Sequence, residues 1–155
     1  MQDIITVNHL SKSYGSHQVL NDISFSFQPG QIIALLGPNG SGKSSLIKIL
    51  TGLIHDYSGE VLIDGEVPGP STKAKIAYLP EKSYLADWMR AVDAIKYIAD
   101  FYPDFDRDKA MRMLDTFGLQ PKQKIKSMSK GMQEKLQLIL VMCLSLIHIS
   151  EPTRP

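Results

Sequence analysis

The stretch Gly37-Pro-Asn-Gly-Ser-Gly-Lys-Ser44 constrains the fold of this chain more than any other. It matches the pattern G-x-x-x-x-G-K-[ST], a glycine-rich loop (the P-loop, or Walker A motif) that wraps the phosphates of a nucleotide. Glycine tolerates the backbone angles that turn successive N–H groups into one anion-binding concavity. The following helix adds the positive potential of its N-terminal end. We expect Lys43 to reach the β- and γ-phosphates and the Ser44 hydroxyl to ligate Mg²⁺.

The segments on either side of this loop fit the motif. Residues 31–36 form a short, nearly unbroken apolar run, which predicts a buried parallel strand. After the loop, apolar residues recur at helical spacing, at Leu46, Ile49, Leu50 and Leu53. A strand, a glycine-rich loop and a helix in this order are the context that the motif requires, and they disfavour a plain surface loop.

The composition bounds the class of protein. With 155 residues, of which 43% are hydrophobic and 21% charged, the chain is typical of one soluble globular domain or part of a larger one. A net charge of +1 gives no electrostatic reason to expect a nucleic-acid or membrane surface. The single cysteine, Cys143, excludes a disulfide framework and suits a reducing cytoplasm. We also expect no secretion signal and no membrane span.

The rest of the chain alternates between strand and helix signals. Strands are predicted over residues 4–10, 19–27 and 76–80 and between the turn signals at 58–59 and 64–65, with a polar turn at 11–15. Two helices follow. The first carries the stripe Val92, Ile95, Ala99 and Tyr102. The second begins after the N-cap Asp106, carries Ala110, Met113, Leu114 and Phe117, and ends at Gly118.

Three stretches together carry a resemblance to a known family. Leu10-Ser-Lys-Ser-Tyr-Gly15, Val19-Leu-Asn-Asp-Ile-Ser-Phe25 and residues 30–45 resemble the opening of an ABC-type ATPase, the ATP-hydrolysing subunit of ATP-binding-cassette transporters. The similarity runs from about Ile4 to about Leu140. It implies an α/β fold: an incomplete P-loop NTPase core with an N-terminal antiparallel β region and an inserted helical subdomain. We expect a partial ATPase domain over residues 1–142, with the helical subdomain at about 85–135.

The resemblance also implies a set of nucleotide-binding residues for ATP and Mg²⁺. Tyr14 falls where the family has an aromatic ring that stacks on adenine, although a half-buried turn tyrosine is the alternative. Met128-Ser-Lys-Gly-Met-Gln133 resembles the signature motif Leu-Ser-Gly-Gly-Gln, which binds the γ-phosphate of ATP held by a second subunit; by itself, the pattern indicates only a helix N-cap. The departures include Lys130, whose charge partly offsets the lost glycine. The implied ATP-binding residues are Tyr14, Gly37, Pro38, Asn39, Gly40, Ser41, Gly42, Lys43, Ser44, Ser45, Ser129 and Gly131.

Glu81 lies where the family has the glutamine of the Q-loop, which senses Mg²⁺ and the attacking water. A carboxylate also ligates Mg²⁺, so the resemblance implies that Glu81 retains this catalytic and metal-binding role. The alternative is a glutamate in a surface turn. Farther along, Trp88 and Met89 either line the groove that receives a membrane partner or, as we favour, pack inside the subdomain.

The resemblance breaks at the end of the chain. The family continues with a buried strand that ends in Asp-Glu (the Walker B residues), whereas this chain has Ser150 and Glu151, with His148 inside the strand. The stretch from Leu144 to Pro155 instead resembles a translated sequencing-adapter tail, so we expect residues 143–155 to be an artefactual tail without function. We also expect the chain as written to be poorly soluble and unable to hydrolyse ATP.

The resemblance implies a transport function. We expect a cytoplasmic subunit, peripheral on the inner face of the membrane, that pairs with a second ATPase subunit and a membrane permease, and we expect no nucleic acid. The alternatives are a soluble ABC-type ATPase acting on ribosomes or DNA, and a nucleotide-binding module without catalysis. The D-x-x-G pattern at Asp56 is typical of GTPases, but the chain has no guanine-reading N-K-x-D motif.

Overall fold

The computed structural model describes residues 2–80, 83–144 and 147–150, and the chain divides into two compact units, Met1–Ile76 and Ala77–Pro155. The first unit contains β1 (Ile5–Tyr14), β2 (His17–Phe27), α1 (Lys43–Leu50), β3 (Ser58–Ile63) and α2 (Pro70–Lys73), and β4 (Ile76–Leu79) begins at its end. The second unit contains α3 (Ala91–Phe101), α4 (Arg107–Thr116), the 3₁₀ helix η1 (Ile125–Ser127), α5 (Lys130–Met142) and β5 (Ile147–Ser150). Among the described residues, no helix is long and apolar enough to cross a membrane.

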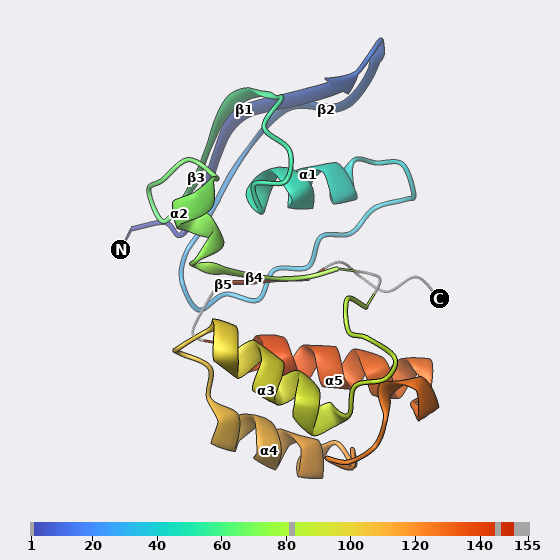
Figure 1. Ribbon diagram of the computed structural model, residues 1–155. Helices are drawn as coiled ribbons and strands as arrows, with labels where there is room; N and C mark the ends of the chain where they lie inside the picture. Colours follow the sequence, from blue (N-terminus) through green and yellow to red (C-terminus); the bar gives the residue numbers. More distant parts are fainter. Residues whose placement is uncertain (1, 81–82, 145–146, 151–155) are drawn as a thin grey trace. The chain divides into compact units, whose positions relative to one another are not determined.

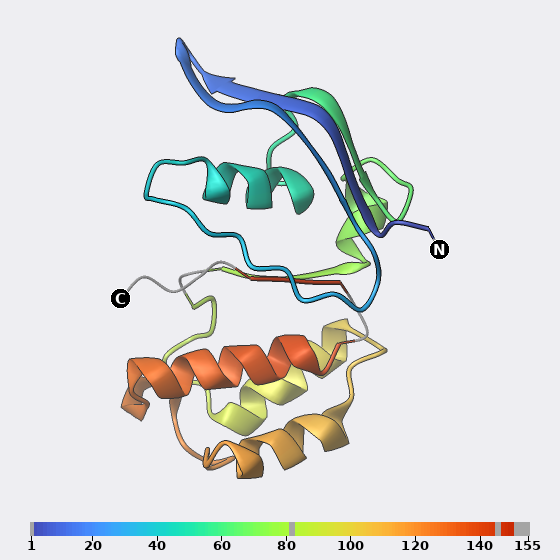
Figure 2. The same cartoon turned by 180° about the vertical axis from the view of Figure 1, so that it is seen from behind.

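The first unit is an antiparallel sheet with one helix along it. The strand order is β2-β1-β3, with β1 paired to both neighbours. Figures 1 and 2 show α1 lying along one face of this sheet. The predicted helical stripe holds for Leu46, Ile49 and Leu50, which are buried, but not for Leu53, which follows the end of α1 and is exposed.

The pairing of β1 with β2 contains two bulges and a further register shift. In the first bulge, Asn8 and His9 of β1 oppose only Ser24; in the second, Asn21 and Asp22 of β2 oppose only Ser11. The register shifts again between Lys12 and Ser13. The bulged residues His9 and Asp22 have φ angles of 51° and 49°. Histidine and aspartate are among the residue types that adopt this left-handed conformation most readily.

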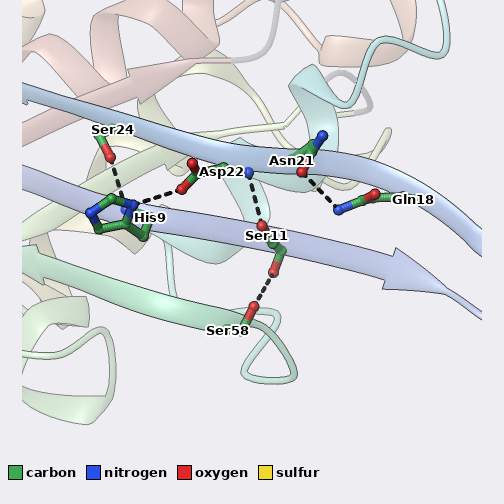
Figure 3. Close-up of polar contacts among 7 residues, drawn as sticks. All are labelled: His9, Ser11, Gln18, Asn21, Asp22, Ser24 and Ser58. Atoms are coloured by element: carbon green, nitrogen blue, oxygen red, sulfur yellow. Dashed lines mark hydrogen bonds and ion pairs between the residues drawn. The ribbon is translucent and has the colours of Figure 1, made fainter.

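Serine hydroxyls satisfy the backbone groups that the two bulges take out of the ladder. The N–H of His9 donates to Ser24 Oγ at 2.8 Å, and the N–H of Asp22 donates to Ser11 Oγ at 2.8 Å (Figure 3). The two bulged side chains also meet, with His9 Nδ1 2.7 Å from Asp22 Oδ1. Each bulge is therefore held by a side chain from the opposite strand, which satisfies the amides of His9 and Asp22.

The bulges change which residues of β1 face the core. Ile5 and Val7 are buried before the bulge, and Leu10 and Lys12 are buried after it, so the alternation shifts by one residue. The predicted polar turn at 11–15 is consequently wrong: β1 continues through Tyr14, and the turn is confined to Gly15 and Ser16. A strict period of two cannot detect a strand whose phase changes in the middle.

The strand predicted at residues 31–36 is not formed in the part of the chain that the structure describes. Neither described sheet includes this segment, and Ile32 and Leu36 are exposed at 101% and 88%. The physical reason is that apolar composition alone does not hold a strand. A strand exists only where neighbouring strands supply a hydrogen-bonding ladder, and β1 of this unit already pairs with β2 and β3.

The second unit is a cluster of three helices, α3, α4 and α5, around an apolar core (Figures 1 and 2). The predicted caps of α4 are confirmed. Asp106 accepts a hydrogen bond from the N–H of Lys109 at 2.8 Å, and Gly118 ends the helix with φ 70°. The Leu119 N–H then returns to the Leu114 carbonyl at 2.8 Å, which closes the last turn.

Two predictions for this unit need correction. The buried face of α3 consists of Ala91, Ala94, Ile95 and Ile98, so the predicted stripe is rotated and Tyr102 lies outside the helix. Met89 is buried as expected, but Trp88 is 74% exposed. The backbone of Met89 is fixed by the Ile125 N–H, which donates to its carbonyl at 2.9 Å. Met89 therefore points inward, and its neighbour in the chain remains outside.

The C-terminal segment contains β5, which pairs with β4 in a two-stranded sheet. Cys143 caps the end of α5 and is buried in the helical core, and its carbonyl accepts a hydrogen bond from the Asp106 N–H at 2.9 Å. Glu151 lies outside the described residues. The artefactual nature of residues 143–155 stays a prediction.

Candidate nucleotide-binding site

The glycine-rich loop leads directly into α1, and the first turn of this helix is open to an anion. Gly42 occupies the N-cap in the left-handed conformation, with φ 90° and ψ 3°, and no side chain caps the helix. The first turn contains no acidic residue. The first N–H groups of a helix have no partner within it, so the positive end of α1 is free to bind an anion.

The Lys43 side chain folds back over the loop. Its Nζ donates to the carbonyl oxygens of Gly37 and Pro38, at 2.7 Å each, and lies 3.4 Å from Ser41 Oγ. The ammonium group is thus held at the loop, where it adds a full positive charge to the partial charge of the helix end. Phosphate oxygens are the ligands that such a combination prefers.

Gly42 lets the start of α1 approach the sheet. A Cβ atom at this position would lie 2.5 Å from the Val19 carbonyl oxygen and 2.8 Å from Leu20 Cδ2. Since those distances are too short for real atoms, only glycine fits between α1 and β2. The loop is therefore anchored against the hairpin that carries Tyr14.

Tyr14 lies at the end of β1, and its hydroxyl is 3.3 Å from Ser45 Oγ on α1. Tyr14 is 49% exposed, which leaves part of the ring surface available to a ligand. Beneath it, the ammonium of Lys12 lies 4.7 Å from the centre of the ring. Of the residues named from the sequence, Tyr14 and the loop therefore come together in one unit, and an aromatic ring lies beside the phosphate-binding loop.

The metal site is less complete in the described residues. Ser44 is exposed in the first turn of α1, where its hydroxyl is accessible. No group of three or more His, Cys, Asp or Glu side chains that could hold a metal occurs among the described residues. Mg²⁺ often takes only one or two protein ligands and completes its shell with phosphate and water, so a single hydroxyl fits this ion. Glu81 lies outside the described residues.

The predicted signature residues lie in the second unit, at the start of α5. Ser129 is the N-cap, and its Oγ accepts a hydrogen bond from the Met132 N–H at 3.2 Å. Gly131 has open space where a side chain would be. Met128, which replaces the leucine of the motif, is buried in the core and so preserves an apolar contact. The N-terminus of α5 is a second helix end that could receive an anion.

Two other side chains of the motif have local partners. Gln133 Nε2 donates to the carbonyls of Ile125 and Met128, at 3.2 and 3.3 Å, and so ties η1 to α5. Lys130 Nζ lies 3.9 Å from Glu134 Oε1. Part of the charge of Lys130 is therefore offset by a carboxylate of the same helix.

Sequence reasoning missed two residues at this site, Lys12 and Asp56. Lys12 Nζ donates to Asp56 Oδ2 at 3.0 Å, so the aspartate of the apparent D-x-x-G pattern is an ion-pair partner of β1. The available signal was the spacing of Lys12 and Tyr14, which lie two residues apart and therefore on the same face of a strand. A buried lysine, however, does not follow from its residue type, because lysine is almost always exposed.

Comparisons with known proteins agree with this geometry. A family model described as "ABC transporter" matches residues 20–153. The zinc import ATP-binding protein ZnuC of Yersinia enterocolitica is 36% identical over 162 residues, covering 99% of this chain and 59% of that protein. The SkfA peptide export ATP-binding protein SkfE of Bacillus subtilis is 34% identical over 158 residues, covering 97% and 66%. The chain thus spans about three fifths of the curated relatives it matches.

Solved structures show the same fold. An ATP-binding subunit of an ABC transporter superposes with a TM-score of 0.80 at 28% identity, covering 95% of this chain and 65% of that one. The protein cbiO1 of Clostridium perfringens, part of the ABC transporter complex cbiONQ, superposes with a TM-score of 0.76 at 20% identity, covering 97% and 65%, which speaks for the fold alone. The predicted fold class, an incomplete P-loop NTPase core with an N-terminal antiparallel region, is confirmed.

Proposed function

Since this chain belongs to the ABC transporter family, we propose that it is the ATP-binding part of a subunit that binds and hydrolyses ATP at a dimer interface to power transport across a membrane. The observation that carries the proposal is the glycine-rich loop at the open N-terminus of α1, with the Lys43 ammonium over it. The names of the relatives favour transport over a role on ribosomes or DNA. They include an importer and an exporter, so the proposal assigns no cargo.

The candidate binding residues of the first unit have separate roles in this proposal. The amides at the start of α1 and Lys43 bind the phosphates and stabilise the negative charge that grows on the γ-phosphoryl oxygens during transfer. The Ser44 hydroxyl would hold Mg²⁺, which would supply positive charge to neutralise the phosphates. Tyr14 orients the adenine by stacking. Water then attacks the γ-phosphorus in line, the bond from this phosphorus to the β–γ bridging oxygen breaks, and ADP is the leaving group.

The second unit completes the site of a partner subunit. We place the γ-phosphate of one subunit at the N-terminus of α5 in the other, where the Ser129 hydroxyl and the helix end both favour an anion. Gly131 leaves room for this approach, since a side chain there would point into open space. ATP therefore joins two chains, and its hydrolysis releases them. Glu81 stays a candidate for sensing Mg²⁺ and the attacking water.

An exposed aromatic surface on the second unit supports the proposed membrane permease as partner. Tyr97 and Phe101 of α3 are exposed, and their ring centres lie 4.9 Å apart. Tyr84 and Tyr102 extend this surface. Partial burial raises the pKa of the Tyr84 hydroxyl, and the neighbouring Tyr102 and Tyr97 raise this pKa further. Tyrosine and phenylalanine are enriched where proteins bind each other. Through such a permease the subunit would sit on the cytoplasmic face of the membrane.

The proposal is tested by measuring ATP binding to the protein and to its Lys43→Ala variant, by calorimetry in the presence of Mg²⁺. Loss of a charge-assisted contact to phosphate costs about 1.5–3 kcal/mol, so we expect ATP affinity to fall by about 10- to 100-fold. Lys48→Ala is the matched control, because Lys48 lies on the exposed face of the same helix. Equal ATP affinity in the Lys43 and Lys48 variants, or no ATP binding by the unmodified protein, would overturn the proposal.

A further inference from the structure

Lys12 is unusual among the charged residues of this chain. It is the one charged residue that is buried in the part of the chain that the structure describes, with 5% of its side chain exposed. A lysine is almost never buried without a partner, because removing its ammonium group from water is costly. Its position on β1 therefore needs a reason.

Two contacts hold the ammonium group in place. Nζ donates to Asp56 Oδ2 at 3.0 Å, and it lies over the face of the Tyr14 ring at 4.7 Å from the ring centre. The distance to the ring falls within the range of cation–π attraction. The Asp56 side chain is 99% exposed, so the carboxylate side of the ion pair is open to solvent while the lysine side is buried. The lysine thus fills the space between a loop carboxylate and an aromatic ring.

A separate contact holds the edge of the same ring. The Tyr14 hydroxyl lies 3.3 Å from Ser45 Oγ, in the first turn of α1. The ring is consequently fixed at one face by a charge and at its hydroxyl by the helix that follows the phosphate-binding loop. One face of the ring is covered by Lys12, and about half of the residue remains exposed.

We propose that Lys12 is a positioning residue for base recognition: its ammonium group covers one face of Tyr14 and orients the other face for the adenine of ATP. This inference rests on the proposed function, since it needs a nucleotide whose phosphates are bound by the loop. It adds a specificity role for a residue that touches no part of the nucleotide. Lys12 acts through Tyr14, and Asp56 acts through Lys12.

The role predicts a selective loss of affinity. The variant Lys12→Met keeps an unbranched apolar side chain and removes the charge. We expect it to weaken ATP binding by about 5- to 10-fold, in line with a partly desolvated cation–π contact. Tripolyphosphate has phosphates and no base. Its affinity for the variant should lie within about twofold of its affinity for the unmodified protein, because the loop and Lys43 are unchanged.

Calorimetric titrations of ATP and of tripolyphosphate, with Mg²⁺ constant, give the ratio of the two dissociation constants for each variant. Lys48→Met is the matched control, which removes one charge from α1 without contacting Tyr14 and should leave the ratio unchanged. If Lys12→Met does not fold, Asp56→Asn decides, because Asp56 is exposed. This variant removes the carboxylate that holds the Lys12 ammonium, and it should raise the ratio of the ATP dissociation constant to the tripolyphosphate dissociation constant by about two- to threefold.

An unchanged ratio in the folded Lys12 variant, or in Asp56→Asn if that variant decides, would overturn the inference. An equal loss for ATP and tripolyphosphate would also overturn it, because it would show a structural effect on the loop. Failure of the unmodified protein to bind ATP would instead overturn the proposed function, so the two failures are distinguishable.

Discussion

At the scale of single residues, the backbone of β1 determines which neighbouring positions must be glycine. Gly59 of β3 lies opposite the β1 bulge with φ 95°. A Cβ atom there would collide with the carbonyl oxygen of His9 and lie 2.6 Å from that of Asn8. Gly131 is the opposite case, because nothing lies within 4 Å of a Cβ atom at that position.

We therefore expect Gly59→Ala and Gly131→Ala to have opposite effects on stability. The first forces a left-handed alanine against backbone atoms and should lower the free energy of unfolding by about 3 kcal/mol. The second places alanine in the first turn of α5 and should change it by less than about 1 kcal/mol, in the stabilising direction. Urea denaturation followed by circular dichroism measures both. Similar midpoints for the two variants would contradict the described bulge.

At the scale of elements, α4 shows how local signals fix the ends of a helix. Its N-cap Asp106 binds the Lys109 N–H, and its C-terminal glycine, Gly118, closes the last turn. Asp108 also lies in the first turn, where its charge interacts favourably with the positive helix end. The two aspartates thus separate a specific cap from a general charge effect.

For this pair we expect Asp106→Ala to lower the free energy of unfolding by about 1 kcal/mol, the usual cost of losing an N-cap. Asp108→Ala should lower it by about 0.3 kcal/mol, and 1 M salt should remove most of that smaller effect through screening. Thermal unfolding of both variants at low and high salt checks the difference. Equal losses for the two variants at low salt would show that Asp106 does not cap α4.

The elements that could be predicted from the sequence are those whose signals are local. The P-loop helix, the caps of α4 and the N-cap Ser129 follow from a few adjacent residues. The strand expected at 31–36 failed because a strand depends on partners far along the chain. The change of phase in β1 was missed for a related reason, since serines of two different strands hold the bulges.

The candidate site divides in the same way. The candidate phosphate-binding residues could be named from the sequence, because the glycines, Lys43 and Ser44 form a contiguous motif; their binding role stays a prediction. The support beneath Tyr14 was not, because Lys12, Ser45 and Asp56 are brought together only by the fold. The apparent GTPase pattern at Asp56 is explained by its ion pair with Lys12.

At the scale of the whole molecule, the chain has two cores, one in each compact unit. The core of the second unit contains the chain's single cysteine, Cys143, which is 3% exposed. Burial raises the pKa of its thiol. The folded unit therefore both shields the sulfur and lowers the fraction present as the reactive thiolate.

We expect Cys143 to react with a thiol reagent at pH 8 at least about 100-fold more slowly in the folded protein than in 6 M urea, because reaction requires the helical unit to open. As the chain has one cysteine, the absorbance change on labelling reports this site alone. Labelling rates measured across a urea series should follow the unfolding of the helices. A fast reaction in the absence of urea would place Cys143 outside the core.

The paired bulges also make the length of the hairpin as important as its composition. Tyr14 faces the same side as Val7 only because one extra residue, at Asn8 and His9, separates them. Deleting one residue there, with Val7 still paired to Phe25, would remove the bulge and leave Tyr14 six residues from Val7, so strict alternation would keep the ring on its present face. Removing the bulge without shortening the strand would instead turn every later side chain of β1 to the other face, and Ser13 would occupy the side now held by Tyr14. The face that Tyr14 occupies thus depends on an odd or even count of residues: the bulge and the extra residue have to be kept together or lost together.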